Sequence, residues 1–240
     1  MPDNPSLENF KDGQVLLFDK PLNWTSFQVV NKVRWLIKKT YGIKKIKVGH
    51  AGTLDPLATG LLIICTGKFT KRIEEFMGQE KEYTGTITLG ATTPSYDLET
   101  EIDATFPLDG ITEAQIRNTT AQFTGNIQQR PPIFSALKKE GKRLYEHARA
   151  GEKVEIPKRE VKISQFEITR IELPEVDFRV VCSKGTYIRS LAHDFGLALS
   201  NGGHLSALRR TKIGSFEAEN AQSITTFTEH LGAGKLLKNS

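Results

Sequence analysis

The residues best suited to chemistry lie in one loop, from Gly49 to Gly60, which reads GHAGTLDPLATG. Its single carboxylate, Asp55, precedes Pro56, and a following proline disfavours helical backbone angles at Asp55. The glycines, which include Gly52, allow positive φ or the close approach of a ligand. Such a loop can aim a catalytic aspartate, but Asp and Gly also populate ordinary surface turns. Local chemistry alone leaves both interpretations open.

Further short motifs accompany this loop along the chain. They are Phe18-Asp19-Lys20-Pro21 with Trp24-Thr25-Ser26, Lys81-Glu82-Tyr83, Arg130-Pro131-Pro132 with Ser135-Ala136-Leu137-Lys138, the segment Cys182 to Arg189, and Leu208-Arg209-Arg210. Together with the aspartate loop, and in this order, they resemble the tRNA pseudouridine synthase B (TruB) family. The resemblance covers residues from about 15 to 213. So many ordered motifs make a chance match very unlikely.

The resemblance implies an isomerase that converts the T-loop uridine of tRNA to pseudouridine. The target base would be flipped out, because its bond to the ribose is inaccessible within a stacked loop. The reaction breaks the N1–C1′ bond, turns the base and forms a C5–C1′ bond, so no cofactor is expected. Asp55 would be the catalytic residue, either as a nucleophile toward the ribose or the base, or as a base that removes a sugar proton. The expected partner is tRNA, recognised at its T stem-loop.

The resemblance also assigns four supporting residues of the active site. Arg189 matches the arginine that pairs with the catalytic carboxylate, and Tyr83 matches the aromatic residue that stacks on the flipped uracil. Tyr187 matches a second active-site tyrosine, and Leu208 an apolar residue that closes the pocket around the base. The alternatives are an arginine that reaches solvent, a half-buried strand tyrosine and a core leucine.

The remaining predicted site residues would contact RNA. His50 resembles the family histidine that fills the place of the flipped base, although a lone loop histidine is usually just exposed. Lys20 would either orient the aspartate loop or meet a phosphate. The other predicted RNA contacts are basic side chains, Lys138, Lys139, Lys142, Arg143, Arg209 and Arg210, of which the last two could instead be a solvated pair.

Composition narrows the class of protein only coarsely. The 240 residues are 38% hydrophobic and 25% charged, as in ordinary globular proteins, and the net charge of +5 suits a polyanion partner. Cys65 and Cys182 lie in apolar runs without metal-ligand spacing, so we expect buried thiols and no metal. The apolar run 61–65 is too short to span a bilayer, and residues 1–6 lack signal-peptide features. A cytoplasmic monomer without membrane contact is the simplest expectation.

Hydrophobic periodicity predicts the elements that must position these residues. We expect helices over 26–39, 112–123 and 187–199, and strands over 14–18, 61–65, 81–89, 161–173 and 176–182. Strands and helices mixed without a regular alternation predict an α+β fold. The resemblance implies the pseudouridine synthase catalytic fold, an extended mixed, mostly antiparallel β-sheet flanked by helices and loops with an RNA-binding cleft.

The expected organisation is one catalytic domain over residues 1–215. A basic, Pro-interrupted segment at about 125–155 resembles the RNA-gripping insertion of the family, although it could be a plain surface loop. The tail over 216–240 lacks the strands needed for the full C-terminal PUA domain that many family members carry.

Two other functions compete with the isomerase. A module that only binds or folds RNA would need a basic surface and no catalytic group, but it has no need for an acidic residue that repels phosphates. A hydrolase with an aspartate nucleophile would act on small molecules without RNA.

Overall fold

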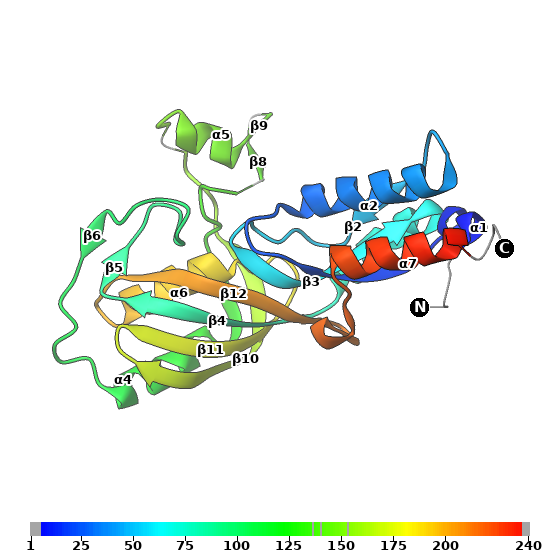
Figure 1. Cartoon of the computed structure of the whole chain (residues 1–240). Coiled ribbons are helices and arrows are strands. Elements are labelled where there is room, and N and C mark those ends of the chain that lie inside the picture. Colours follow the sequence, from blue (N-terminus) through cyan, green and yellow to red (C-terminus); the bar gives the residue numbers. More distant parts are fainter. Residues whose placement is uncertain (1–5, 136, 140, 153, 237–240) are drawn as a thin grey trace. The chain divides into compact units, whose positions relative to one another are not determined.

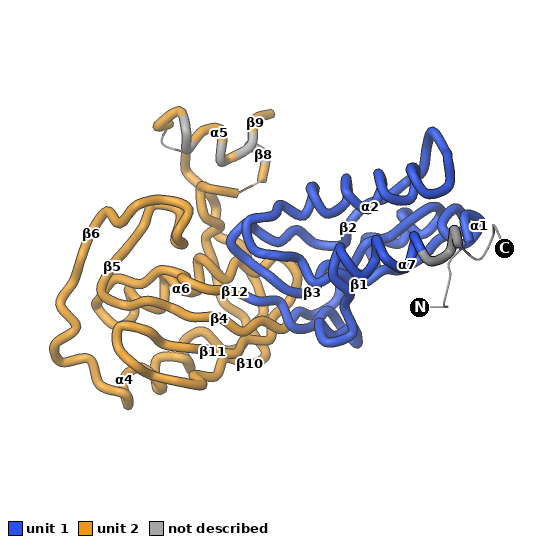
Figure 2. Tube along the Cα trace, viewed as in Figure 1, with its two compact units in different colours: residues 1–81, 209–240 blue, residues 82–208 orange. Residues whose placement is uncertain are grey.

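A computed structural model of the chain describes residues 6–135, 137–139, 141–152 and 154–236. It is an α+β structure with a large, mostly antiparallel sheet, which confirms the predicted fold class (Figure 1). The chain forms two compact units, residues 1–81 with 209–240 and residues 82–208 (Figure 2). Among the described residues, no helix has the length and apolar character needed to cross a membrane.

The first unit is built from both ends of the chain. Its elements are α1 (Leu7–Asp12), β1 (Val15–Lys20), α2 (Ser26–Tyr41), β2 (Val48–His50), β3 (Ala58–Thr66), the 3-10 helix η1 (Gly67–Arg72), α3 (Ile73–Gly78), β13 (Phe216–Glu217), η3 (Ala218–Asn220) and α7 (Ile224–Leu236). Strands β1 and β2 both pair antiparallel with β3. Helices α2 and α7 lie side by side (Figure 1), and their apolar residues join those of the strands in one core.

Helix α2 has a capping signal in the sequence at each of its ends. Thr25 and Gln28 form a capping box at its start, and Gly42 adopts a left-handed conformation after its end. Its buried face includes Val30 and Val33, as the periodicity predicts. Arg34, in the middle of the helix, donates to the Val48 carbonyl at 2.8 Å and so joins α2 to the strand that precedes the aspartate loop.

The second unit contains the longest strands. Its elements are β4 (Lys81–Leu89), β5 (Ala91–Thr92), β6 (Ala104–Thr105), α4 (Glu113–Thr119), η2 (Thr120–Phe123), β7 (Gly125–Gln129), β8 (Lys138–Lys139), β9 (Lys142–Arg143), α5 (Leu144–Arg149), β10 (Arg159–Glu172), β11 (Glu175–Cys182) and α6 (Ile188–Ala198). Strand β10 pairs antiparallel with both β11 and β7. Phe195 of α6 packs on Phe166 of β10 at 5.5 Å between ring centroids, which anchors α6 in the core.

Strand β12 (Gly203–Ile213) supplies residues to both units and carries the Leu208-Arg209-Arg210 motif. Neither β12 nor α7 was predicted from periodicity. The predicted helix over 112–123 is α-helical only to Thr119 and continues as a 3-10 turn, and its capping box between Thr112 and Gln115 is confirmed. Both cysteines are buried and form no disulfide, as expected.

Candidate active site

The aspartate loop is anchored on one side by α2. Ser26, in the first turn of the helix, is buried, and its hydroxyl donates to the Leu54 carbonyl at 3.0 Å. The same hydroxyl accepts from the Leu54 N–H at 2.8 Å. Both main-chain polar groups of the residue before Asp55 are therefore satisfied by one side chain.

Lys20 anchors the other side of the loop. It lies at the end of β1 with 0% of its surface exposed, and its ammonium donates to the carbonyls of Pro21 at 2.9 Å, Trp24 at 2.6 Å and Pro56 at 3.3 Å. Burial lowers the pKa of Lys20 to about 8, the negative charge of Asp55 opposes this shift, and the positive charge of Arg210 adds to it. Of its two predicted roles, this geometry matches the orientation of the aspartate loop.

Arg210 fixes the start of the loop from β12. Only 1% of its surface is exposed, and it donates to the carbonyls of Leu61 at 2.8 Å and Gly52 at 3.0 Å. Gly60 has φ +97°, and a Cβ added there would lie 2.3 Å from the Arg210 carbonyl oxygen, so only glycine fits. From the sequence, Arg210 was expected either to contact a phosphate or to be solvated beside Arg209. In the structure its side chain is buried instead. An RNA contact at this residue stays a prediction.

These anchors leave Asp55 in a loop that is held on both sides. The Pro56 carbonyl accepts from the Asn23 N–H at 2.9 Å as well as from Lys20, and the Asp55 carbonyl accepts from the Ala58 N–H at 3.1 Å. A carboxylate on such a loop loses little freedom when a substrate binds, which is the preorganisation that a reacting group needs.

Two other predicted RNA-binding residues lie in the same unit. His50, in β2, has a buried Nδ1 without a hydrogen-bond partner, and burial together with the nearby Arg210 lowers its pKa. Its imidazole is therefore neutral at pH 7, which suits a ring that inserts among bases more than one that binds phosphate. Arg209 is half-exposed and makes a bidentate ion pair with Asp19 at 3.0 and 2.7 Å.

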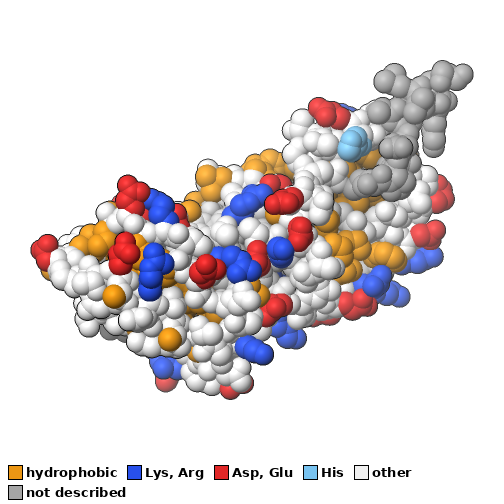
Figure 3. All heavy atoms as spheres, turned by 90° about the horizontal axis from the view of Figure 1, so that it is seen from below, with side chains coloured by type: hydrophobic (Ala, Val, Ile, Leu, Met, Phe, Trp, Pro, Cys, Tyr) orange, Lys and Arg blue, Asp and Glu red, His pale blue; other side chains and the backbone are white. Residues whose placement is uncertain are grey.

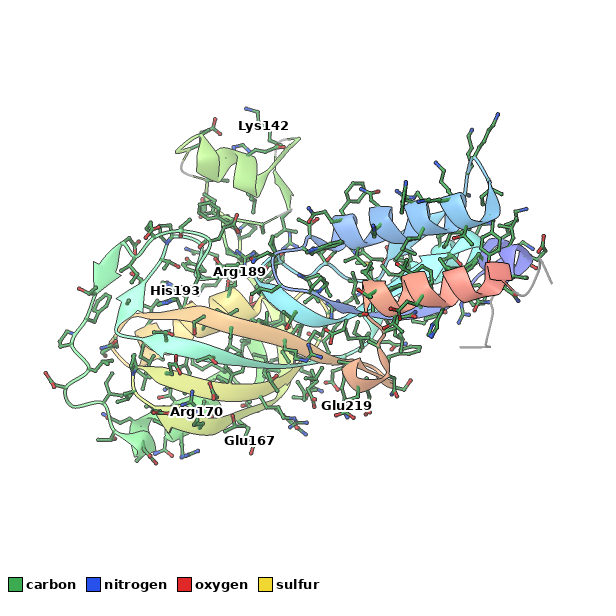
Figure 4. The ribbon with its side chains drawn as sticks, in the orientation of Figure 1. Lys142, Glu167, Arg170, Arg189, His193 and Glu219 are labelled. Carbon is green, nitrogen blue, oxygen red and sulfur yellow. The ribbon has the colours of Figure 1, made fainter. Side chains whose placement is uncertain are left out.

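Arg189 lies in the first turn of α6 in the second unit, and only 5% of its surface is exposed (Figure 4). It donates to the carbonyls of Ser95 at 3.3 Å and Phe134 at 2.9 Å, and its Nε lies 3.6 Å from a carboxylate oxygen of Asp97. Its predicted pairing with Asp55 stays a prediction. The buried ion pair with Asp97 was not predicted.

Asp97 belongs to a tight turn that the sequence analysis did not single out. The hydroxyls of Thr93 and Ser95 donate to its carbonyl, and its carboxylate accepts from the N–H two residues on, as in an Asx turn. The neighbouring Tyr96 stacks on His193 of α6 at 3.9 Å between centroids. The turn-forming composition of Thr93 to Asp97 was a usable local signal, but its partner on α6 lies too far along the chain to be inferred.

The predicted tyrosines occupy defined positions in this unit. Tyr83, on β4, is 8% exposed, and Tyr187 is the residue immediately before the first turn of α6. The buried Gln129 side chain accepts from the Tyr187 N–H at 2.8 Å and donates to its carbonyl at 3.0 Å. Leu208 is half-buried on β12. Both main-chain polar groups of Tyr187 are thus satisfied by one side chain, as those of Leu54 are by Ser26.

Of the insertion predicted at about 125–155, residues 125–129 instead form β7 of the large sheet, and the remainder contains the short hairpin of β8 and β9 followed by α5. Lys142 is exposed (Figure 4), whereas the side chains of Lys138, Lys139 and Arg143 lie outside the described residues. Leu144 and His147 of α5 are buried, and the His147 imidazole lies against the Glu152 carboxylate. Among the described residues, no group of three or more His, Cys, Asp or Glu side chains could hold a metal ion.

Comparison with solved structures identifies the class of protein. One chain of a Cbf5-Nop10-Gar1 complex matches with a TM-score of 0.69 at 32% identity, over 93% of this chain and 56% of that one. A chain of an H/ACA RNP bound to a substrate RNA containing 2′-deoxyuridine matches with a TM-score of 0.65 at 30% identity, over 95% and 58%. The fold is that of the pseudouridine synthases. The chain spans little more than half the length of these structural matches.

Sequence comparison gives the family within that class. The model described as "TruB family pseudouridylate synthase (N terminal domain)" matches residues 38–188, and the "tRNA pseudouridylate synthase B C-terminal domain" matches residues 189–237. A tRNA pseudouridine synthase B of Flavobacterium johnsoniae is 66% identical over 93% of this chain and 98% of its own length. One of Phocaeicola vulgatus is 57% identical over 93% and 95%. The chain belongs to the TruB family, so the predicted family is confirmed.

Proposed function

We propose that Asp55 is the reacting group of a tRNA pseudouridine synthase that acts on the T-loop uridine. The observation that carries this proposal is the loop itself, in which Lys20, Ser26 and Arg210 hold the main chain around a single carboxylate. Membership of the TruB family supplies the reaction class, an isomerisation carried out on RNA.

The reaction needs no group from outside. The N1–C1′ bond breaks, the base turns, a C5–C1′ bond forms, and the proton that leaves C5 is balanced by a proton gained at N1. Asp55 takes part as a nucleophile toward the ribose or the base, or as the base that removes a sugar proton. No cofactor enters any of these routes.

The supporting residues act on the flipped base. Tyr83 stacks on the uracil, where stacking contributes about 1–3 kcal/mol per base. Tyr187 and Leu208 complete the pocket, and Arg189 pairs with the Asp55 carboxylate. The fixed main chain of Tyr187 and the hydrogen-bonded, buried guanidinium of Arg189 support these roles, because both residues are held in place before RNA binds.

The remaining predicted residues contact the RNA around the flipped uridine. His50 fills the vacated place in the loop, and its neutral ring suits that task. Lys20 and Arg210 act mainly by holding the aspartate loop, whereas Arg209 and the exposed Lys142 face phosphates, together with Lys138, Lys139 and Arg143. The catalytic domain predicted over residues 1–215 also takes in α7 of the tail, because Phe227 and Leu231 belong to the core of the first unit. The insertion, predicted at about 125–155, grips the RNA, and we expect a cytoplasmic monomer.

The test is to incubate the purified protein with an unmodified tRNA transcript and to measure carbodiimide-resistant uridine adducts. The expected result is one new adduct at the T-loop uridine. An RNA-binding module would bind the transcript and leave it unmodified, whereas a small-molecule hydrolase would act without RNA. Either outcome would contradict the proposal.

A further inference from the structure

The positive charge of the chain is concentrated in one segment. Residues 26–50 contain seven Lys and Arg residues and no Asp or Glu. The whole chain has 33 basic and 28 acidic residues, so the rest of it carries 26 basic against 28 acidic side chains. The entire excess of positive charge therefore lies on α2 and the turn that follows it, within the first unit.

Six of these cations form what we call the α2 lysine surface, namely Lys32, Lys38, Lys39, Lys44, Lys45 and Lys47. All are half-buried or exposed, and no acidic side chain among the described residues pairs with any of them. The seventh cation, Arg34, is excluded because it donates to the Asn31 side chain at 2.6 Å and to the Val48 carbonyl at 2.8 Å.

An exposed tryptophan organises the helical part of this surface. Trp35 is 49% exposed, and the ammonium groups of Lys32 and Lys39 lie 4.8 and 4.7 Å from its ring centroid. These cation–π contacts hold two lysines on one exposed face of α2. They leave the ammonium groups able to meet an anion, because the ring does not neutralise their charge.

Some other basic side chains of the chain do have acidic partners. Arg170, on β10, is surrounded by Glu172, Glu175 and Asp177, with which it forms ion pairs. The face shown in Figure 3 likewise mixes acidic and basic side chains. A cluster of lysines without acidic neighbours repels itself, and a polyanion relieves that repulsion.

The distance along α2 from the aspartate loop to the α2 lysine surface indicates which part of an RNA this surface would contact. Ser26, at the start of α2, holds the residue before Asp55. At 1.5 Å per residue, Lys32 lies roughly 9 Å and Lys39 roughly 20 Å further along the helix axis. If the target uridine of an RNA lies at Asp55, these lysines would therefore contact nucleotides other than the target uridine.

We propose that the α2 lysine surface binds the phosphate backbone of the RNA stem next to the loop that carries the target uridine. This inference rests on the proposed function, because that function places the uridine at Asp55. Lysine is a flexible point charge, so these contacts position the stem without reading its sequence.

The test uses the triple variant Lys32→Gln/Lys38→Gln/Lys39→Gln, because glutamine keeps the helix propensity of lysine. Its matched control is Lys11→Gln/Lys71→Gln/Lys162→Gln, which removes three exposed lysines elsewhere and changes net charge equally. Two RNA hairpins with the same T loop serve as substrates, one with a short stem and one with the stem extended by a helical turn. Binding is measured by filter retention across a salt series, and pseudouridine formation at saturating RNA.

For the extended hairpin, the α2 variant should bind at least about tenfold more weakly than the wild type, and the slope of log affinity against log salt should fall by about two to three. The rate at saturation should stay unchanged. Extending the stem should strengthen binding by the wild type but not by the variant. The inference is overturned if the α2 variant binds like its control, or if stem extension benefits wild type and variant equally. A wild type that binds in this pattern but forms no pseudouridine would contradict the proposed function and not the binding surface.

Discussion

The aspartate loop is held through its main chain, whereas Arg189 is held through its own guanidinium. Around Asp55, the anchoring contacts fall on main-chain atoms of Gly52, Leu54 and Pro56. Around Arg189, a buried carboxylate and two carbonyls contact the guanidinium directly. The main-chain anchors of the aspartate loop do not depend on which side chain stands at position 55. A side chain that is itself an anchor carries stability as well, so the two residues should respond differently to substitution.

The largest effect on stability is expected for Arg189→Met. Removing the guanidinium leaves the Asp97 carboxylate buried without its partner, and breaking a buried pair in this way costs about 3–5 kcal/mol. Urea unfolding monitored by circular dichroism measures the loss. The double variant Arg189→Met/Asp97→Asn should recover part of it, because no uncompensated charge remains. A single variant as stable as the wild type would show that Arg189 is not an anchor.

Gly60→Ala should be the next most damaging change, at about 3 kcal/mol. The new Cβ would meet the Arg210 carbonyl oxygen at 2.3 Å in a left-handed conformation. Gly42→Ala is the matched control, since Gly42 also has positive φ but open space around its Cβ position, and it should cost only about 1 kcal/mol. Thermal unfolding measures the stability of both variants. The loss in Gly42→Ala reports backbone strain alone, and the additional loss in Gly60→Ala reports the clash with Arg210. Equal losses would mean that the close approach of β3 and β12 contributes little.

Ser26→Ala tests whether the main-chain anchors serve catalysis. The variant leaves the Leu54 N–H and carbonyl without their buried partner, so we expect a loss of about 1–3 kcal/mol. The rate at saturating tRNA should fall about tenfold or more, with KM little changed, because the loop is less well oriented. Thr25→Ala, which removes only the helix cap, should cost about 1 kcal/mol and leave the rate unchanged. The interpretation fails if the two variants have the same rate.

The last expected effect is a dependence of stability on pH, and it concerns Lys20. Its pKa is lowered from 10.5 to about 8 in the folded protein, so between these values the unfolded chain binds a proton that the folded chain does not. The free energy of unfolding should therefore gain a positive contribution as pH rises from about 8 to 10.5. Urea unfolding at several pH values in this window measures the slope for the wild type and for Lys20→Met. An identical slope in both proteins would exclude Lys20 as its source.

Much of the fold could be predicted because its signals are local. The capping box at Thr112, the buried face of α2 and the alternation along β4 each depend on residues within one element, and each is found where expected. Strand β12 was missed because its half-buried, basic sequence lacks the alternation of a typical strand.

The site was predictable only as far as the family resemblance named residues. The buried positions of Lys20 and Arg210 could not be inferred, because Lys and Arg are rarely buried and their carbonyl partners depend on tertiary structure. Asp97 was missed for a similar reason, since it meets Arg189 from a turn far away in the sequence. The roles of Asp55, Tyr83, Tyr187 and Leu208 stay predictions.

The most direct test of the account is the Asp55→Asn variant, measured for pseudouridine formation on an unmodified tRNA transcript. Because the loop is anchored through its main chain, the free energy of unfolding should stay within about 1 kcal/mol of the wild type, and tRNA affinity should be retained. Turnover should fall at least about a thousandfold, because the reacting carboxylate is gone. A variant that forms pseudouridine at a rate comparable with the wild type would contradict the assignment of Asp55.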